Sequence, residues 1–158
     1  MQDLERRAMR FLKSPRFVVS AVALCVIAVD QITKSLAEAN LATHSVKLIG
    51  PLSLELVYNS GVAFSIGSGD TAVVTVVELL VIAGMILYVR RITTLGLATG
   101  FGMVIGGALG NICDRLFRNN HGSVIDFIHS GFWPTFNLAD SAVVVGIVVI
   151  LLASRSKG

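Results

Sequence analysis

Four apolar segments dominate the pattern of hydrophobic and polar positions along the chain. They cover residues 17–37, 71–89, 94–112 and 137–153. Each approaches the length of about 20 residues that an α-helix needs to cross the hydrocarbon core of a bilayer. The prediction rests on length, because helical periodicity is weak where a segment faces lipid on most sides. The sequence therefore predicts an all-α membrane protein with four transmembrane helices, built as a single domain over residues 1–158.

Two polar segments, 40–70 and 113–136, separate these helices on one side of the membrane. The run Leu52-Ser53-Leu54-Glu55-Leu56 alternates apolar and polar side chains, which is typical of a half-buried strand. Turn-forming residues flank it at Gly50-Pro51 and at Asn59-Ser60-Gly61. We expect the first segment to form a small extracytoplasmic β-sheet and the second to form a short loop or helix.

The composition fits a chain that has the bilayer as its solvent. Hydrophobic residues make up 54% and charged residues 15%, and the mean hydropathy is +0.77. Too few charges are present to cover a water-soluble globule. The net charge of +3 does not indicate a nucleic-acid partner, because the basic residues lie at the ends of the apolar runs and not in one patch.

The basic residues divide unevenly between the two sides of the membrane. Nine lie before the first span, between the second and third spans, or after the fourth, and four lie in or beside the two polar segments. Because Lys and Arg accumulate in cytoplasmic loops, both termini should be cytoplasmic and segments 40–70 and 113–136 should lie outside. The nine are Arg6, Arg7, Arg10, Lys13, Arg16, Arg90, Arg91, Arg155 and Lys157, and the four are Lys34, Lys47, Arg115 and Arg118.

The start of the chain is similar to a signal peptide. A basic region precedes an apolar run, and Ala37-Glu38-Ala39 imitates a cleavage site. Asp30 and Lys34 lie between the run and that site, which is unusual for a signal peptide. We therefore expect a retained first helix.

The third span is rich in glycine at helical spacing. Gly96 and Gly100, Gly102 and Gly106, and Gly106 and Gly110 are each four residues apart. Small residues at this spacing let helices approach closely in a membrane. We expect most of these glycines to serve packing.

Ionisable residues at membrane depth are costly and are therefore candidate functional residues. Asp30 follows only thirteen apolar residues, or about 20 Å of helix, so it should lie in the outer part of the bilayer. Lys34 follows four positions later, where a local ion pair would explain both residues and would also be compatible with support of a site. Asp114 and Arg115 end the third span, where they would close the helix, anchor the next loop or pair with other charges.

Asp126 and Asp140 are the acids that require the most explanation. Asp126 lies in the apolar run Val124-Ile125-Asp126-Phe127-Ile128, and Asp140 lies three residues after Asn137 at the start of the fourth span. A cap at Asn137 with an acid in the first turn explains Asp140 but not Asp126. The topology brings both acids and Asp30 to one interface, where carboxyl groups that share a site do not all ionise easily. One then activates water as a base and another acts as an acid, which is aspartic-protease chemistry.

Other chemistries find little support in the sequence. His44, His121 and His129 are scattered without metal-ligand spacing, so we expect no metal and no cofactor. Gly67-Ser68-Gly69-Asp70 matches the Gly-x-Gly-Asp motif of presenilin-like and prepilin-type aspartyl peptidases. Here the motif ends a polar loop, so Asp70 is expected to cap the second helix instead.

Two alternative functions remain open at this point. A small transporter or channel with an acidic relay would also need carboxyl groups within the membrane. It predicts ionisable groups at several depths, whereas these gather at the outer edge, with Glu78 in the second span as an unassigned exception. A non-catalytic assembly factor built on the glycine-rich helix would leave Asp126 and Asp140 without a role.

At five places the chain resembles the lipoprotein signal peptidases, the signal peptidase II family of bacterial membrane aspartyl peptidases. Any one block is a weak signal, but five blocks in order on four spans are specific, and they extend over nearly the whole chain. The blocks are Asp30-Gln31-Ile32-Thr33-Lys34, Asn59-Ser60-Gly61-Val62-Ala63-Phe64, Gly106-Gly107-Ala108-Leu109-Gly110-Asn111 with Asp114-Arg115, Val124-Ile125-Asp126-Phe127, and Phe136-Asn137-Leu138-Ala139-Asp140.

The resemblance implies that Asp126 and Asp140 form a catalytic dyad. It also implies a substrate, a diacylglyceryl-modified prolipoprotein that is cut before its lipidated cysteine at the outer face of the bacterial inner membrane. We expect a monomer that contacts membrane lipid and binds no nucleic acid. The segment 46–70 is expected to cover the peptide, with Gly61 permitting close approach or unusual backbone angles and Phe64 forming an apolar wall. The residues expected to line or support the site are Asp30, Lys34, Asn59, Asn111, Asp114, Arg115 and Asn137.

Overall fold

Four long helices form most of the protein. The computed structural model describes residues 1, 5–6, 12, 14–61 and 71–155. The helices are α2 (Pro15–Leu41), α3 (Thr71–Val89), α4 (Leu95–Phe117) and α5 (Leu138–Arg155), and each is long and apolar enough to cross a membrane. The predicted four spans are therefore confirmed.

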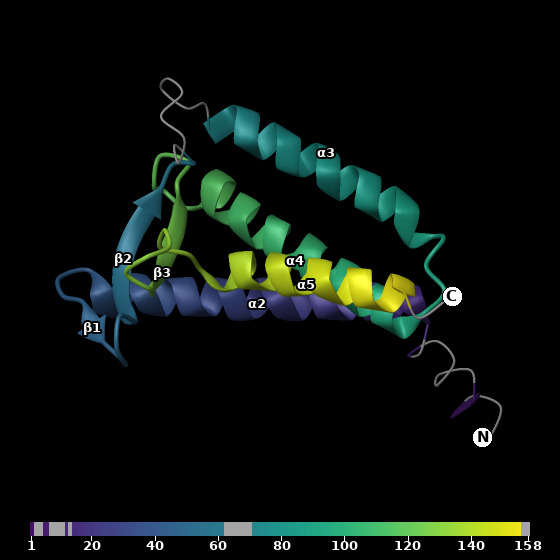
Figure 1. Cartoon of the computed structure of the whole chain (residues 1–158). Helices are drawn as coiled ribbons and strands as arrows, with labels where there is room; N and C mark the ends of the chain where they lie inside the picture. The colour runs from purple at the N-terminus through teal and green to yellow at the C-terminus, as the bar shows by residue number, and fades with distance from the viewer. Residues whose placement is uncertain (2–4, 7–11, 13, 62–70, 156–158) are drawn as a thin grey trace.

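The helix α4 lies at the centre of the bundle. It packs closely against both α2 and α5, whereas α3 packs mainly against α4 and has few buried residues of its own. Figure 1 shows α2, α4 and α5 side by side and α3 at the outside of the bundle. Of the described residues of α3, only Thr75 and Ile82 are buried, so the many exposed apolar side chains of this helix are left for lipid to cover.

Glycine permits the close packing of α4. A Cβ atom at Gly106 would lie 2.8 Å from the carbonyl oxygen of Ala23 in α2, and one at Gly107 would overlap the carbonyl oxygen of Ala139 in α5. No side chain fits at either distance, so the two glycines let both neighbouring backbones touch α4.

Two helices extend further than the sequence predicted. The helix α2 begins after the N-cap Ser14, whose side chain accepts a hydrogen bond from the Phe17 amide, and it continues to Leu41 instead of residue 37. The helix α4 continues to Phe117 instead of residue 112. Charged residues in the last turns of α4 suggested an earlier end, but buried ion pairs keep these residues inside the helix, as described below.

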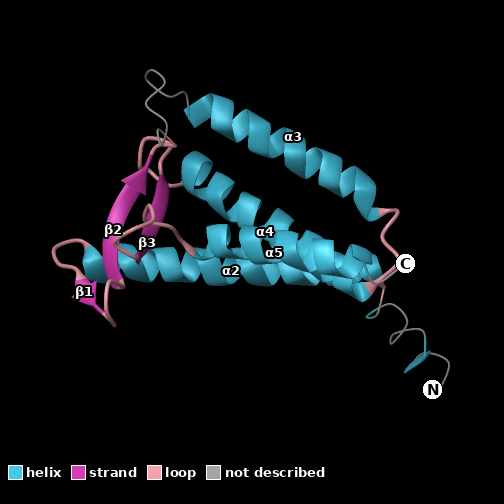
Figure 2. Cartoon of the chain, viewed as in Figure 1, coloured by secondary structure: helices cyan, strands magenta, loops and turns pink. Residues whose placement is uncertain are grey.

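A three-stranded antiparallel sheet lies across one end of the bundle (Figure 2). Its order is β1 (Val46–Lys47), β2 (Ser53–Asn59) and β3 (Val124–His129). The sheet predicted in the first polar segment is confirmed, but its third strand comes from the second polar segment, where a loop or helix was expected. The first four residues of β3 are all buried, which accounts for the unbroken apolar run in this strand.

The sheet is fixed to the bundle through its apolar side chains. Ala37 and Leu41 of α2 form a buried cluster with Phe127 of β3, and Leu54 and Leu56 of β2 pack against it. Two of the three alternating leucines, Leu54 and Leu56, therefore pack against the bundle. This packing places the strand that carries Asp126 beside the ends of α2, α4 and α5.

Candidate active site

Lys34 lies at the centre of a buried polar cluster. Its side chain is fully buried, and its Nζ lies 2.8 Å from Asp30 Oδ2 and 2.8 Å from Asp114 Oδ2. The same Nζ donates a hydrogen bond of 2.9 Å to Asn111 Oδ1. The local pair with Asp30 that the spacing predicted is present, but Lys34 also joins α2 to α4. A buried charge is tolerated only when paired and hydrogen-bonded in this way.

Asp30 connects the cluster to the start of α5. Its Oδ1 accepts a hydrogen bond of 3.0 Å from the amide of Ala139, which satisfies one of the unpaired donors at that helix N-terminus. A Cβ atom at Gly110 would lie 2.7 Å from Asp30 Oδ2. Gly110 therefore makes room for a carboxylate as well as for helix packing.

Asn137 and Asp140 cap α5 reciprocally. The Asp140 amide donates to Asn137 Oδ1 at 2.9 Å, and the Asn137 amide donates to Asp140 Oδ2 at 3.2 Å. This arrangement is a capping box, so the cap predicted for Asn137 is present. It holds one oxygen of Asp140, while the other accepts a hydrogen bond of 2.9 Å from Asn111 Nδ2.

Asp126 lies on β3 and faces two amide side chains. Asn137 Nδ2 donates to its Oδ1 at 2.7 Å, and Asn59 Nδ2 on β2 donates to its Oδ2 at 2.9 Å. Only 1% of Asp126 is exposed. Asn137 thus contacts Asp126 through its side chain and Asp140 through its backbone amide. It thereby joins β3 to the N-terminal end of α5.

The surroundings of Asp126 favour its protonated form. Burial raises the pKa of its carboxyl group to about 6, and the charge of Asp140 adds to this effect. The hydrogen bonds from Asn59 and Asn137 and the charge of Lys34 lower the same pKa, but less than burial raises it. The carboxyl group of Asp126 therefore keeps its proton to a higher pH than an ordinary aspartate does.

Asp114 and Arg115 have separate roles at the end of α4. Asp114 is fully buried, and its Oδ2 accepts a hydrogen bond of 3.1 Å from the amide of Ile125, next to Asp126. Arg115 forms an ion pair of 2.7 Å with Glu78 of α3, and its side chain is 7% exposed. The partner of Glu78, which the sequence left unassigned, is thus the arginine that follows Asp114, and this pair ties α3 to the bundle.

Sequence reasoning missed Gln31 and Arg118 as parts of this network. Gln31 Nε2 donates 2.8 Å to Asp114 Oδ1 and 3.1 Å to the carbonyl of Gly110. Arg118 Nε lies 3.2 Å from Asp114 Oδ1, and its guanidinium also pairs with Glu38. The available signal was the position of Gln31 beside Asp30 at membrane depth.

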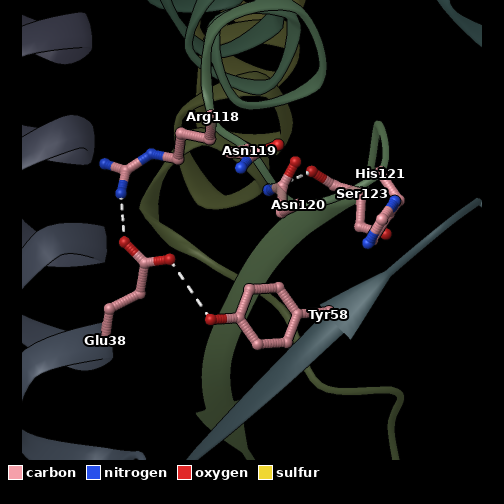
Figure 3. A pocket seen from close by; sticks show the side chains of 7 residues that line it. All are labelled: Glu38, Tyr58, Arg118, Asn119, Asn120, His121 and Ser123. Carbon is pink, nitrogen blue, oxygen red and sulfur yellow. Dashed lines mark hydrogen bonds and ion pairs between the residues drawn. The ribbon is translucent and has the colours of Figure 1, made fainter.

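Figure 3 shows the end of this network beside the sheet, where Arg118, the C-cap of α4, and Tyr58 of β2 both point to Glu38 of α2. They line a polar pocket of about 600 Å³ together with residues 119–121 and Ser123. Arg118 contacts Gln31, Ser35 and Glu38 of α2, and Tyr58 of β2 contacts the same Glu38. We therefore interpret this pocket as the place where the sheet is joined to α2 and α4.

An apolar cavity of about 510 Å³ opens beside Asp140. Its wall contains residues of α5, such as Ser141 and Val144, and aromatic residues of the loop that precedes α5. A cavity of this size and lining can accept a hydrocarbon chain. The carboxyl group of Asp140 therefore lies at the edge of an apolar cavity.

Most of the residues predicted for the site meet in this network. Gly61 adopts a φ of +84°, and its amide donates 2.9 Å to Asn59 Oδ1, so this glycine shapes the turn that holds Asn59. Phe64 and Asp70 lie outside the described residues. In the part of the chain that is described, no three His, Cys, Asp or Glu side chains gather as metal ligands do. The predicted residues that the structure joins are Asp30, Lys34, Asn59, Asn111, Asp114, Asp126, Asn137 and Asp140.

A helical membrane bundle that brings two carboxyl groups to one asparagine, with an apolar cavity beside one of them, has the features of a membrane aspartic peptidase. The family model described as "Signal peptidase (SPase) II" matches residues 22–155. The chain therefore belongs to the signal peptidase II family. Members of this family are aspartic peptidases that remove signal peptides from prolipoproteins in membranes.

Curated relatives and solved structures agree with this assignment. The chain is 42% identical over 142 residues to a lipoprotein signal peptidase of Rhodococcus jostii. The match covers 87% of this chain and 72% of that protein. It is 40% identical over 155 residues to a lipoprotein signal peptidase of Mycobacterium leprae, and this match covers 95% of this chain and 77% of that protein. A bacterial membrane enzyme solved by the in meso method at 1.9 Å resolution superposes with a TM-score of 0.76 at 26% identity, covering 85% of this chain and 90% of that one. These relatives favour the peptidase over the transporter.

Proposed function

We propose that Asp126 and Asp140 are the catalytic pair and that they hydrolyse the peptide bond before the lipidated cysteine of a diacylglyceryl-prolipoprotein. The observation that carries this proposal is their convergence on Asn137, which contacts both carboxyl groups. Burial of Asp126 supports it further, because the raised pKa of about 6 leaves a proton available to the pair.

The chemistry needs one ionised and one protonated carboxyl group. The ionised group removes a proton from water as the water oxygen attacks the scissile carbonyl carbon. The protonated group then donates its proton to the leaving nitrogen when the C–N bond breaks. The charge of Asp140 acts on Asp126, so we assign the two roles to the pair and not to a fixed member.

The remaining polar residues would hold this pair in place. Lys34 orients Asn111, which donates a hydrogen bond to Asp140. Asp30 accepts a hydrogen bond from the backbone amide of Ala139, the residue before Asp140. Asn59 contacts Asp126 from β2. These contacts fix the position of each carboxyl group before substrate binds, which reduces the reorganisation needed during the reaction. Arg115 fastens α3 near the same level.

The depth of the pair suits a substrate that is itself anchored by lipid. Asp126 lies on β3 and Asp140 in the first turn of α5, and Figure 1 shows the sheet across the end of the bundle. An acyl chain can enter the apolar cavity beside Asp140. The distribution of basic residues supports a site on the outer face of the bacterial inner membrane, with both termini in the cytoplasm. We further propose that a single chain, a monomer without a nucleic-acid partner, contains the complete site within one domain.

Cleavage of a diacylated prolipoprotein peptide by Asp126→Asn and Asp140→Asn tests the pair. Each variant should lose at least about 100-fold in cleavage rate, because general acid–base catalysis contributes that much or more. Glu55→Gln, which removes a carboxylate on β2 that pairs with His129, is the matched control and should retain most of the activity. If both aspartate variants are folded in thermal unfolding and cleave at the normal rate, the proposed pair is wrong.

A further inference from the structure

The loop between β3 and α5 exposes two large aromatic side chains. Phe132 is 83% exposed and Trp133 is 65% exposed. The loop lies just before Leu138, the first residue of a membrane-spanning helix. Tryptophan at such a position is characteristic of the boundary between lipid and water, because its ring is apolar and its N–H is polar.

The base of this loop is firmly held. Phe136 and Ile128 form an antiparallel bridge, with hydrogen bonds of 2.8 and 3.1 Å between their backbones. Thr135 Oγ1 lies 3.1 Å from His129 Nδ1 and donates to Glu55 Oε1 at 3.2 Å. The base is thus joined to the sheet by polar contacts, and the aromatic tip is held out from the protein with little of its own surface covered.

A second exposed apolar residue belongs to the adjacent turn. Ile49, in the turn between β1 and β2, is 85% exposed. That turn touches the loop, because a Cβ atom at Gly131 would lie 3.4 Å from the Cβ of Pro51. Ile49 on one side, and Phe132 and Trp133 on the other, thus lie on two segments that touch, and we call these three exposed apolar side chains the apolar rim.

We propose that the apolar rim inserts into the headgroup–acyl boundary of the outer leaflet and fixes the depth of the active site in the bilayer. The occupant of this surface is bilayer lipid, because the rim adjoins the start of a membrane span and contains no charged side chain. The loop connects β3, which carries Asp126, to α5, which carries Asp140. Its insertion therefore sets the level of both acids, and Phe132 and Trp133 form the lipid-facing wall of the apolar cavity beside Asp140.

The single tryptophan of the chain gives a direct test, which does not require activity. The full chain is reconstituted in bilayers that contain phosphatidylcholine brominated either near the headgroup end or near the methyl end of its acyl chains. Trp133 fluorescence should be quenched more strongly by the shallow label, and bilayer insertion should protect it from aqueous iodide. Strong iodide quenching without quenching by either lipid would place Trp133 in water, and stronger quenching by the deep label would place it in the hydrocarbon core. Either result overturns the proposal.

Substitutions at the neighbouring rim position separate lipid contact from loop folding. Phe132→Ser should weaken the quenching of Trp133 by the shallow label and increase its quenching by iodide, because the rim loses part of its apolar surface. Phe132→Leu keeps an apolar side chain and should preserve the wild-type pattern. Equal quenching in the serine and leucine variants would show that the rim does not hold the loop in the membrane.

Discussion

At Asp126, burial and hydrogen bonding act on the carboxyl group in opposite directions. Burial raises its pKa to about 6, and the hydrogen bond from Asn59 lowers it. Asn59→Ala removes that bond, so the pKa of Asp126 should rise above its wild-type value. If the reaction needs a proton on the pair, kcat/KM falls as pH rises through about 6 in the wild type, and the fall should occur at a higher pH in the variant. The pH dependence of kcat/KM measures this shift.

The adjacent residue on β2 supplies the control. Tyr58 hydrogen-bonds Glu38 through its hydroxyl group, and among the described residues the side-chain hydrogen bonds of Asp126 come from Asn59 and Asn137. Tyr58→Phe should therefore leave the alkaline limb of the pH profile where it is in the wild type. An alkaline limb that stays in place or moves to lower pH in Asn59→Ala would contradict the prediction, whatever the change in maximal rate.

Single residues were predictable from sequence where their partners are close in the chain. The pairing of Asp30 with Lys34 follows from helical spacing, and so does the cap formed by Asn137 at α5. The second partner of Lys34 is Asp114, on another helix. Likewise, the partner of Glu78 lies 37 residues away. Spacing along the chain contains no information about such contacts, since they depend on how the helices pack.

At the scale of elements, length and composition predicted the four spans but not the third strand. The helices follow from hydrocarbon thickness, which every span must match. The run Val124-Ile125-Asp126-Phe127-Ile128 is short and apolar, a pattern that a buried strand shares with a piece of helix. Its pairing with β2 joins two polar segments that are far apart in the chain, and neither segment alone indicates it.

The contact of α4 with α5 gives a prediction at this scale. In Gly107→Ala, the added methyl group would overlap the carbonyl oxygen of Ala139, which precedes Asp140. The backbone must move, and overpacking of this kind costs about 1–3 kcal/mol. We expect a lower thermal unfolding temperature in detergent and a lower cleavage rate, because the displaced residue adjoins Asp140.

A second glycine provides a matched comparison on the loosely packed helix α3. A Cβ atom at Gly84 would meet nothing within 4 Å. Gly84→Ala should therefore leave cleavage unchanged and unfold at the same or a higher temperature, since alanine favours the helical backbone by about 0.5–1 kcal/mol. If Gly107→Ala behaves like Gly84→Ala in both assays, the packing of α4 does not position the head of α5.

At the scale of the whole molecule, the site works only if the sheet faces the side from which the lipidated substrate is reached. The sheet lies at one end of the bundle and the connection between α3 and α4 lies at the other (Figure 1). With Cys25 and Cys113 replaced by alanine, Thr43→Cys in the turn before β1 should react with a membrane-impermeant maleimide on intact spheroplasts. Thr93→Cys lies in the connection between α3 and α4 and should react only after permeabilisation. This connection contains Arg90 and Arg91 and should therefore be cytoplasmic. The reverse labelling pattern would place Asp126 and Asp140 on the cytoplasmic side, where they could not serve the proposed reaction.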